Sequence, residues 1–319
     1  MVKIFLVLLL AHLIADFVTQ TTYINENKKR INYRLYSKGL LYHVIHHFVL
    51  SCTLLFIFME WSSIYIPVVI IITILHYFID LAKIYAEEKI ILFFREKNRD
   101  EKFWLHHLLE KKTTYFILDQ FLHVLSIYVV LSLFQQSPSI GALFHLFLAE
   151  GQVLAGDTKW IMLGILFILI TFASAHFIAV VMSDLQEQKI EDSIAATLDL
   201  EDEHMKQLKN KIHLTKSNFV INEAYKAKDA NYTFQVQYQK YNNESENSRG
   251  KYIGILERIL IMVFVVQNVF QGLALLIGMK TITRFKQFED KSFAEYYLIG
   301  TLLSLTIGIA IAFAIRRIF

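Results

Sequence analysis

The stretch MVKIFLVLLLAHLIADFVTQ, residues 1–20, decides the fold because it is a long apolar segment interrupted by polar residues at a regular spacing. His12, Asp16 and Gln20 are each four positions apart, so on an α-helix they share one face of an otherwise apolar cylinder. Lys3 precedes the apolar run, but no small-residue cleavage site follows it, which argues against a cleaved signal peptide. We therefore predict a membrane-spanning helix with one polar stripe.

The same spacing returns in three later apolar segments, each of which carries a polar pair. The pairs are His43 and His47, His76 and Asp80, and Asp119 and His123. Ionisable side chains are costly inside a bilayer and normally face the interior of a helix bundle or a watery cavity. We therefore expect four helices whose polar faces meet.

The composition is that of an integral membrane protein, with 55% hydrophobic residues and a mean hydropathy of +0.41. A net charge of +3, with the basic residues spread beside apolar segments, gives no reason to expect nucleic-acid binding. The single cysteine, Cys52, excludes an intramolecular disulfide and a cysteine-based zinc motif. We predict an all-α fold, a polytopic transmembrane helix bundle of about seven spans with a polar cytoplasmic insert.

Seven segments contain the roughly 20 apolar residues that a membrane span requires. They are residues 2–21, 39–58, 63–83, 114–135, 158–183, 252–279 and 293–315. The chain is accordingly divided into a four-helix unit with the His/Asp cluster at 1–135, an outer connection and fifth helix at 136–183, the polar insert at 184–250, and a C-terminal helix pair at 251–319.

The basic residues in the connections predict the orientation of these spans. Residues 89–112 are rich in Lys and Arg and residues 136–157 contain neither, so we expect the N-terminus outside and the polar pairs near the cytoplasmic face. Seven spans also place Arg316 and Arg317 inside. The basic residues at 280–291 would then lie outside, against the rule, and a re-entrant or interfacial piece in the last two segments is the alternative.

The insert at 184–250 mixes acidic and basic residues. Its first part has a helix-forming composition, residues 231–241 alternate in the manner of a strand, and residues 242–250 have the composition of a loop. A solvated surface is the simpler interpretation of such mixed charge, and a binding site for a cytoplasmic protein partner is the alternative.

In the predicted orientation the polar pairs form two layers about 6 Å apart. The shallow layer contains Asp16, His43, Asp80 and Asp119, and the deep layer contains His12, His47, His76 and His123. Imidazole and carboxylate groups are ligands for zinc, manganese and iron, and a helical i, i+4 pair can place two ligands on one ion. We predict that these eight residues hold one or two divalent metal ions, with zinc as the first choice, in a cavity open to the cytoplasm.

Four more residues are candidates for supporting roles around this cluster. Gln20 and Gln120 could orient metal ligands or form structural hydrogen bonds, and His176 and Glu257 fall at the same depth. A proton relay, or a polar core that only joins the helices, is the alternative to a metal site.

Several motifs are similar to one bacterial membrane family. They are AHLIADFVTQ at 11–20, HVIHH at 43–47, HYFIDLAK at 76–83 and LDQFLH at 118–123, with GILERILI at 254–261 and FAEYYLIGTLLS at 293–304 resembling longer members. The chain resembles the family called domain of unknown function 3307. That resemblance implies a multi-pass protein of the bacterial inner (plasma) membrane and no established activity.

Three functions are compatible with these features, and the lipid bilayer is the partner common to all of them. The first is a metal-dependent hydrolase of a lipid or lipid-linked substrate, in which Asp119 or Asp16 accepts a proton. The second is a non-catalytic membrane subunit with a structural polar core. The third is a metal or proton transporter, whose polar path would continue through Gln267, Asn268 and Gln271.

Overall fold

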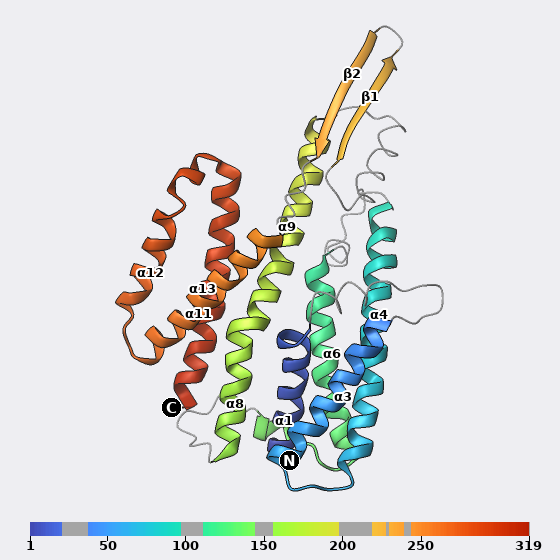
Figure 1. Cartoon of the computed structure of the whole chain (residues 1–319), viewed down its shortest axis with the longest axis vertical. Coiled ribbons are helices and arrows are strands. Elements are labelled where there is room, and N and C mark those ends of the chain that lie inside the picture. Colours follow the sequence, from blue (N-terminus) through green and yellow to red (C-terminus); the bar gives the residue numbers. More distant parts are fainter. Residues whose placement is uncertain are drawn as a thin grey trace. The chain divides into compact units, whose positions relative to one another are not determined.

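The computed structural model describes most of the chain as helix (Figure 1). The described residues are 1–20, 38–96, 111–143, 156–197, 219–227, 230–238 and 244–318. The chain divides into two compact units, one comprising Met1–Leu185 with Gly254–Phe319 and the other Gln186–Ile253.

Helix α1 (Val2–Leu13) is the centre of the first unit, because every residue from Ile4 to Leu13 is buried. The helices around it are α3 (Lys38–Phe58), α6 (Lys112–Leu133) and α8 (Asp157–Ile168), and α4 (Tyr65–Glu96) packs against α3 and α6. A helix that is apolar on all sides is stable in this form only when other helices or lipid surround it. The N-terminal segment is therefore the core around which the bundle is built.

The described part of the first unit contains two π-helical turns, close to the predicted site. Turn η1 (Ile14–Val18) continues α1 and carries Asp16, and turn η2 (Leu169–Ala173) joins α8 to α9 (Ser174–Thr197). A π turn pairs each amide with a carbonyl five residues earlier, as the Thr19 amide does with the Ile14 carbonyl at 3.0 Å. The two π turns pack against each other, so two irregular backbone segments meet beside Asp16.

The C-terminal part contains α11 (Glu244–Val266), α12 (Gln271–Ile282), the 3₁₀ turn η3 (Phe285–Glu289) and α13 (Lys291–Ile318). The predicted single span at 252–279 is wrong, because the chain reverses between α11 and α12. Asn268 adopts a positive φ of 60° in this turn, and a Cβ atom on Gly272 would lie 2.8 Å from the Phe264 ring. At about 1.5 Å per residue, α12 is roughly 18 Å long and too short to cross a bilayer alone. Helices α11 and α12 therefore form a helical hairpin.

Because of this hairpin, residues 280–291 and the C-terminus lie at the opposite ends of the bundle from those that seven spans would give. The Tyr296 hydroxyl at the start of α13 lies 3.4 Å from the Met182 carbonyl of α9, whereas Ile315 at its end belongs to the same apolar core as Ile4. Figure 1 accordingly shows both chain termini at one end of the first unit. Arg316 and Arg317 thus lie at the N-terminal end, opposite to the seven-span prediction, and the basic residues of 280–291 join the end where α6 begins.

Five of the described helical segments are long and apolar enough to span a membrane. They are Lys38–Phe58, Tyr65–Glu87, Lys112–Leu133, Asp157–Leu185 and Phe293–Ile318. Their outward faces carry exposed large apolar side chains, such as Phe56, Ile74 and Phe121, while the His and Asp residues of the predicted pairs are buried. An apolar surface around a polar interior indicates a membrane protein, because lipid replaces water as the surrounding solvent. The first predicted span is helical as far as Val18 and is not among these five.

The second unit contains an antiparallel hairpin of β1 (Phe219–Ala227) and β2 (Ala230–Tyr238). Its register pairs Phe219 with Tyr238 and Ala227 with Ala230. The strand predicted at 231–241 is confirmed over 231–238 as part of β2, and residues 239–241 lie outside the described residues. Its partner β1 was not predicted. Because α11 begins at Glu244, the loop predicted at 242–250 is wrong over its last seven residues.

The α11–α12 hairpin predicts on which side of the membrane the turn η3 lies. In a Cys52→Ala background, a cysteine at Gln287 should react with a membrane-impermeant thiol reagent from the same side as a cysteine at Lys111. A cysteine at Gly141, where an added Cβ meets nothing within 4 Å, marks the opposite side. Labelling of right-side-out and inside-out vesicles measures this. Reaction of the Gln287 variant together with the Gly141 variant would restore the seven-span arrangement.

Candidate metal centre

The polar pairs occupy the inward stripes of α3, α4 and α6. On α4 the buried positions His76, Asp80 and Ile84 follow one another at four-residue intervals, and on α6 Asp119 and His123 continue in the same way to the buried Ile127. Apolar packing beyond the pairs therefore fixes which face of each helix turns inward. The buried hydrophobic residues one turn further along each helix thus orient the polar side chains toward one another.

All eight predicted residues meet in one cluster at the centre of the bundle. They form three metal-capable groups, namely Asp16, His43, His47 and His76; His12, His76 and His123; and Asp80, Asp119 and His123. Within each group one nitrogen or oxygen of every side chain lies within 4.8 Å of the others. The two predicted layers merge at the level of these atoms, since the groups combine members of both.

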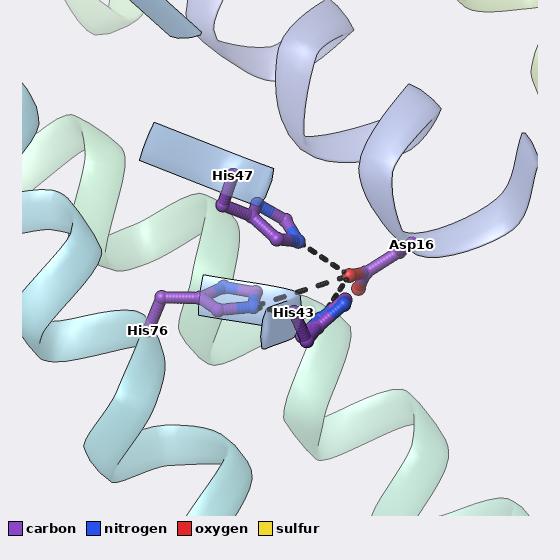
Figure 2. Close-up of side chains that lie close together, drawn as sticks. All are labelled: Asp16, His43, His47 and His76. Carbon is purple, nitrogen blue, oxygen red and sulfur yellow. Dashed lines mark hydrogen bonds and ion pairs between the residues drawn. The ribbon is translucent and has the colours of Figure 1, made fainter. Parts of the chain in front are cut away.

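The first group is arranged around one carboxylate (Figure 2). Oδ1 of Asp16 lies 2.9 Å from Nε2 of His47, 3.1 Å from Nε2 of His43 and 4.0 Å from Nε2 of His76. In Figure 2 the imidazoles of α3 and α4 point toward the same oxygen. Three nitrogens and one oxygen from three elements thus lie close enough together to hold a metal ion.

The third group shares no residue with the first. Nε2 of His123 lies 3.7 Å from Oδ1 of Asp80 and 3.8 Å from Oδ1 of Asp119. These two carboxylates and one imidazole form a harder donor set than the first group, of the kind that suits manganese or iron. The ring of His12 lies 4.9 Å from the ring of His123, centroid to centroid, and connects this set to the N-terminal helix.

Some polar atoms of the cluster are buried without a hydrogen bond. Both ring nitrogens of His123 and Oδ1 of Asp119 have no hydrogen-bond partner among the residues that the structure describes. A buried polar atom left in this state costs about 1–3 kcal/mol. One ring nitrogen of His123 and Oδ1 of Asp119 can each offer a lone pair to a metal ion, so these residues fit a metal.

Of the two glutamines predicted to support the cluster, Gln120 contacts it directly. Its amide nitrogen donates to Oδ2 of Asp16 and to Oδ2 of Asp119, both at 3.2 Å, and its carbonyl oxygen lies 3.3 Å from Nε2 of His12. Gln20 is half-buried beyond the end of η1, and no hydrogen bond joins it to these residues in the described part of the chain.

Lys83 belongs to the cluster and was missed from the sequence. Its ammonium group lies 2.8 Å from Oδ2 of Asp119, and its side chain is 24% exposed whereas that of Asp119 is 3% exposed. Lys83 therefore connects the buried carboxylates to the edge of the bundle. Its spacing is the signal that could have found it, because positions three after Asp80 and seven after His76 share their helix face.

The remaining candidates lie outside the three groups. The His176 ring contacts the rings of Phe17 and Phe116, with centroids 6.0 and 5.3 Å away. Glu257 forms an ion pair of 2.7 Å with Lys280 of α12. His46 could share a face with His43, but its Nε2 lies 2.9 Å from the Thr19 hydroxyl instead. Both His176 and Glu257 thus have neighbours other than the cluster.

Residues 4–148 match the family described as "Protein of unknown function (DUF3307)". This part of the chain belongs to the DUF3307 family. The DUF3307 segment contains all eight residues of the cluster as well as Lys83 and Gln120. Neither a curated protein nor a solved structure matches the chain. The DUF3307 name assigns no activity, so the chemistry has to be argued from the site.

The hydrogen bonds of Gln120 predict its contribution to stability. Replacing it with Leu keeps most of its volume but removes its bonds to Asp16, Asp119 and His12, so the free energy of unfolding should fall by about 1–3 kcal/mol. Equilibrium unfolding in detergent micelles measures this. Gln20→Leu is the matched control and should change stability much less. Equal effects of the two substitutions would contradict the geometry of Gln120.

Proposed function

We propose that the protein is a multi-pass protein of the bacterial inner membrane that holds a divalent metal ion, zinc in the first place, in its His/Asp cluster. We further propose that it uses this ion to hydrolyse a lipid or lipid-linked substrate near the inner leaflet. In this arrangement α1 and the five long apolar helices span the membrane and the α11–α12 hairpin is re-entrant. The observation that carries the proposal is the convergence of three imidazoles on the Asp16 carboxylate.

The charge of the cluster supports the binding of a cation. Asp16, Asp80 and Asp119 contribute three carboxylates, and Lys83 contributes one ammonium group. When the histidines are neutral, the cluster carries a net charge of −2 in an apolar bundle. Uncompensated charge in such surroundings is strongly unfavourable. One divalent ion balances this charge.

The geometry supports a different proposed role for each of the two catalytic candidates, Asp16 and Asp119. Asp16 lies within ligand distance of the imidazoles and is best used as a metal ligand with His43, His47 and His76. Such an ion would activate a water molecule and polarise a carbonyl or phosphoryl oxygen. Asp119 keeps one oxygen without a hydrogen bond in the described structure, while Lys83 and Gln120 hold the other. This orientation suits a proton acceptor.

A structural polar core is the second candidate function, and a specific observation favours it. Several cluster members already bond to one another, as His43 and His76 do through ring nitrogens 3.2 Å apart. Such bonds stabilise helix association without an ion. A transporter has less support, because Gln267, Asn268 and Gln271 lie in and just after the turn between α11 and α12 and do not line a continuous span.

Metal content tests the proposed site directly. Elemental analysis of the detergent-purified full-length protein should find about one divalent ion per chain, or two if the Asp80 group is also filled. His76→Ala should remove most of it, because His76 belongs to two of the three groups. His46→Ala, which changes a histidine on the same helix as His43 and His47, is the matched control. A folded wild-type protein without metal, even after zinc is added, would favour the structural core.

Hydrolysis separates the role of Asp119 from metal binding. The probe is a vesicle of phosphatidylethanolamine and phosphatidylglycerol, with mass spectrometry of the released products. Asp119→Asn should keep the ion of the Asp16 group. It should slow the rate of hydrolysis by about 10²–10⁴-fold, because it removes the proton acceptor. Unchanged hydrolysis in this variant would exclude Asp119 as the acceptor.

A further inference from the structure

Arg258 of α11 is buried at the place where the C-terminal helices meet the α8–α9 segment. Arg258 is only 2% exposed to solvent. Nε donates to the Ile170 carbonyl at 2.7 Å, Nη2 donates to the Thr171 carbonyl at 3.1 Å, and Nη1 donates to the Ser304 hydroxyl at 3.2 Å. One guanidinium group therefore joins three segments of the chain, namely α11, η2 and α13.

Two glycines leave room for this side chain. A Cβ atom on Gly254 would lie 3.2 Å from Nη1 of Arg258, and a Cβ atom on Gly308 would lie 3.5 Å from its Cγ. Larger residues at Gly254 would push the guanidinium group from its place. The site for Arg258 is thus built from the shapes of both C-terminal helices.

The carbonyls that Arg258 binds belong to the π turn η2, and the Ser174 hydroxyl donates to the same two carbonyls at 2.6 and 3.4 Å. A π turn departs from the regular pairing of helix amides and carbonyls. Hydrogen bonds from an ionised donor are roughly twice as strong as neutral ones. Burial of an arginine is costly when its donors are not satisfied. Arg258 and η2 therefore stabilise each other.

Turn η2 in turn packs against η1, the turn that carries Asp16. The contact between these segments continues on both sides. A Cβ on Gly164 of α8 would lie 3.6 Å from Leu10 of α1, and the ring of His176 of α9 lies 6.0 Å from that of Phe17 in η1. The position of η2 therefore sets the position of η1.

We infer that Arg258 is a positioning residue for the metal site, which fixes the Asp16 carboxylate by holding η2 against η1. This inference rests on the proposed function for its effect on metal binding. All the ligands of the site lie inside the DUF3307 segment. In this inference the C-terminal helices, which lie outside that segment, stabilise the position of one of these ligands. Asp16 is the ligand affected because it alone of the first group lies on η1.

Two measurements on the full-length protein test this inference. The first is hydrogen exchange of the metal-free protein, where Arg258→Met should speed exchange of the amides of 14–18 and leave those of α3 unchanged. The second is titration with cobalt(II), where Arg258→Met should lower the affinity by about tenfold and alter the visible absorption bands of the bound ion. Arg258→Lys keeps the positive charge, so both the increase in amide exchange and the loss of cobalt affinity should be smaller than in Arg258→Met.

Matched variants separate positioning from general destabilisation. Glu257→Gln alters the neighbouring residue on α11 but not η2, and Val130→Ala opens a small cavity in α6; both should keep wild-type cobalt spectra. Wild-type exchange at 14–18 in a folded Arg258→Met or Arg258→Lys protein would overturn the inference. Wild-type protein that binds no cobalt would contradict the proposed function instead, while the exchange measurement still decides whether Arg258 positions η1.

Discussion

The structure depends on a carboxylate and three imidazoles that meet inside an apolar helix bundle. The Asp16 side chain is only 9% exposed, and its charge cannot remain in such surroundings without compensation. The inward faces of α3 and α4 provide this compensation, because they bring His43, His47 and His76 to the same oxygen of Asp16. Electrostatics therefore adds to apolar packing in holding these helices together.

Successive layers of residues hold this cluster in place. Gln120 bonds to two carboxylates and to His12, and Lys83 binds Asp119 at the edge of the bundle. Farther away, the bonds of Arg258 to η2 tie the C-terminal helices to the turn beside Asp16. Preorganised ligands of this kind lower the cost of binding an ion, since few side chains have to move. The distribution of these supports is what the proposed metal centre requires.

Much of the site could be predicted from the sequence, because helical periodicity is simple. The i, i+4 spacing of His76 and Asp80, repeated in the other segments, was sufficient to assign all eight residues to one interior, and the structure brings them together. Lys83 could have been predicted in the same way, because its spacing from His76 and Asp80 places it on the same helix face. The two partners of Arg258 in η2 were not, because they are backbone carbonyls and carry no sequence signal.

The C-terminal fold was predicted less well for a physical reason. Hydropathy measures how apolar a segment is and does not detect a reversal of direction within it. The reversal depends on the positive φ of Asn268 and on the close approach of Gly272 to Phe264, and one asparagine and one glycine are weak signals on their own. The misplaced basic residues of 280–291 were the stronger warning, since they conflicted with the charge rule until the α11–α12 hairpin was known.

The most direct test of this account is X-ray absorption at the zinc edge of the zinc-loaded full-length protein. The account predicts a first shell of about four nitrogen and oxygen atoms near 2.0–2.1 Å, with outer-shell scattering from about three imidazoles that decreases in His76→Ala. A shell made only of oxygen, without imidazole scattering and unchanged in His76→Ala, would show that zinc is not bound by the cluster and would contradict the account.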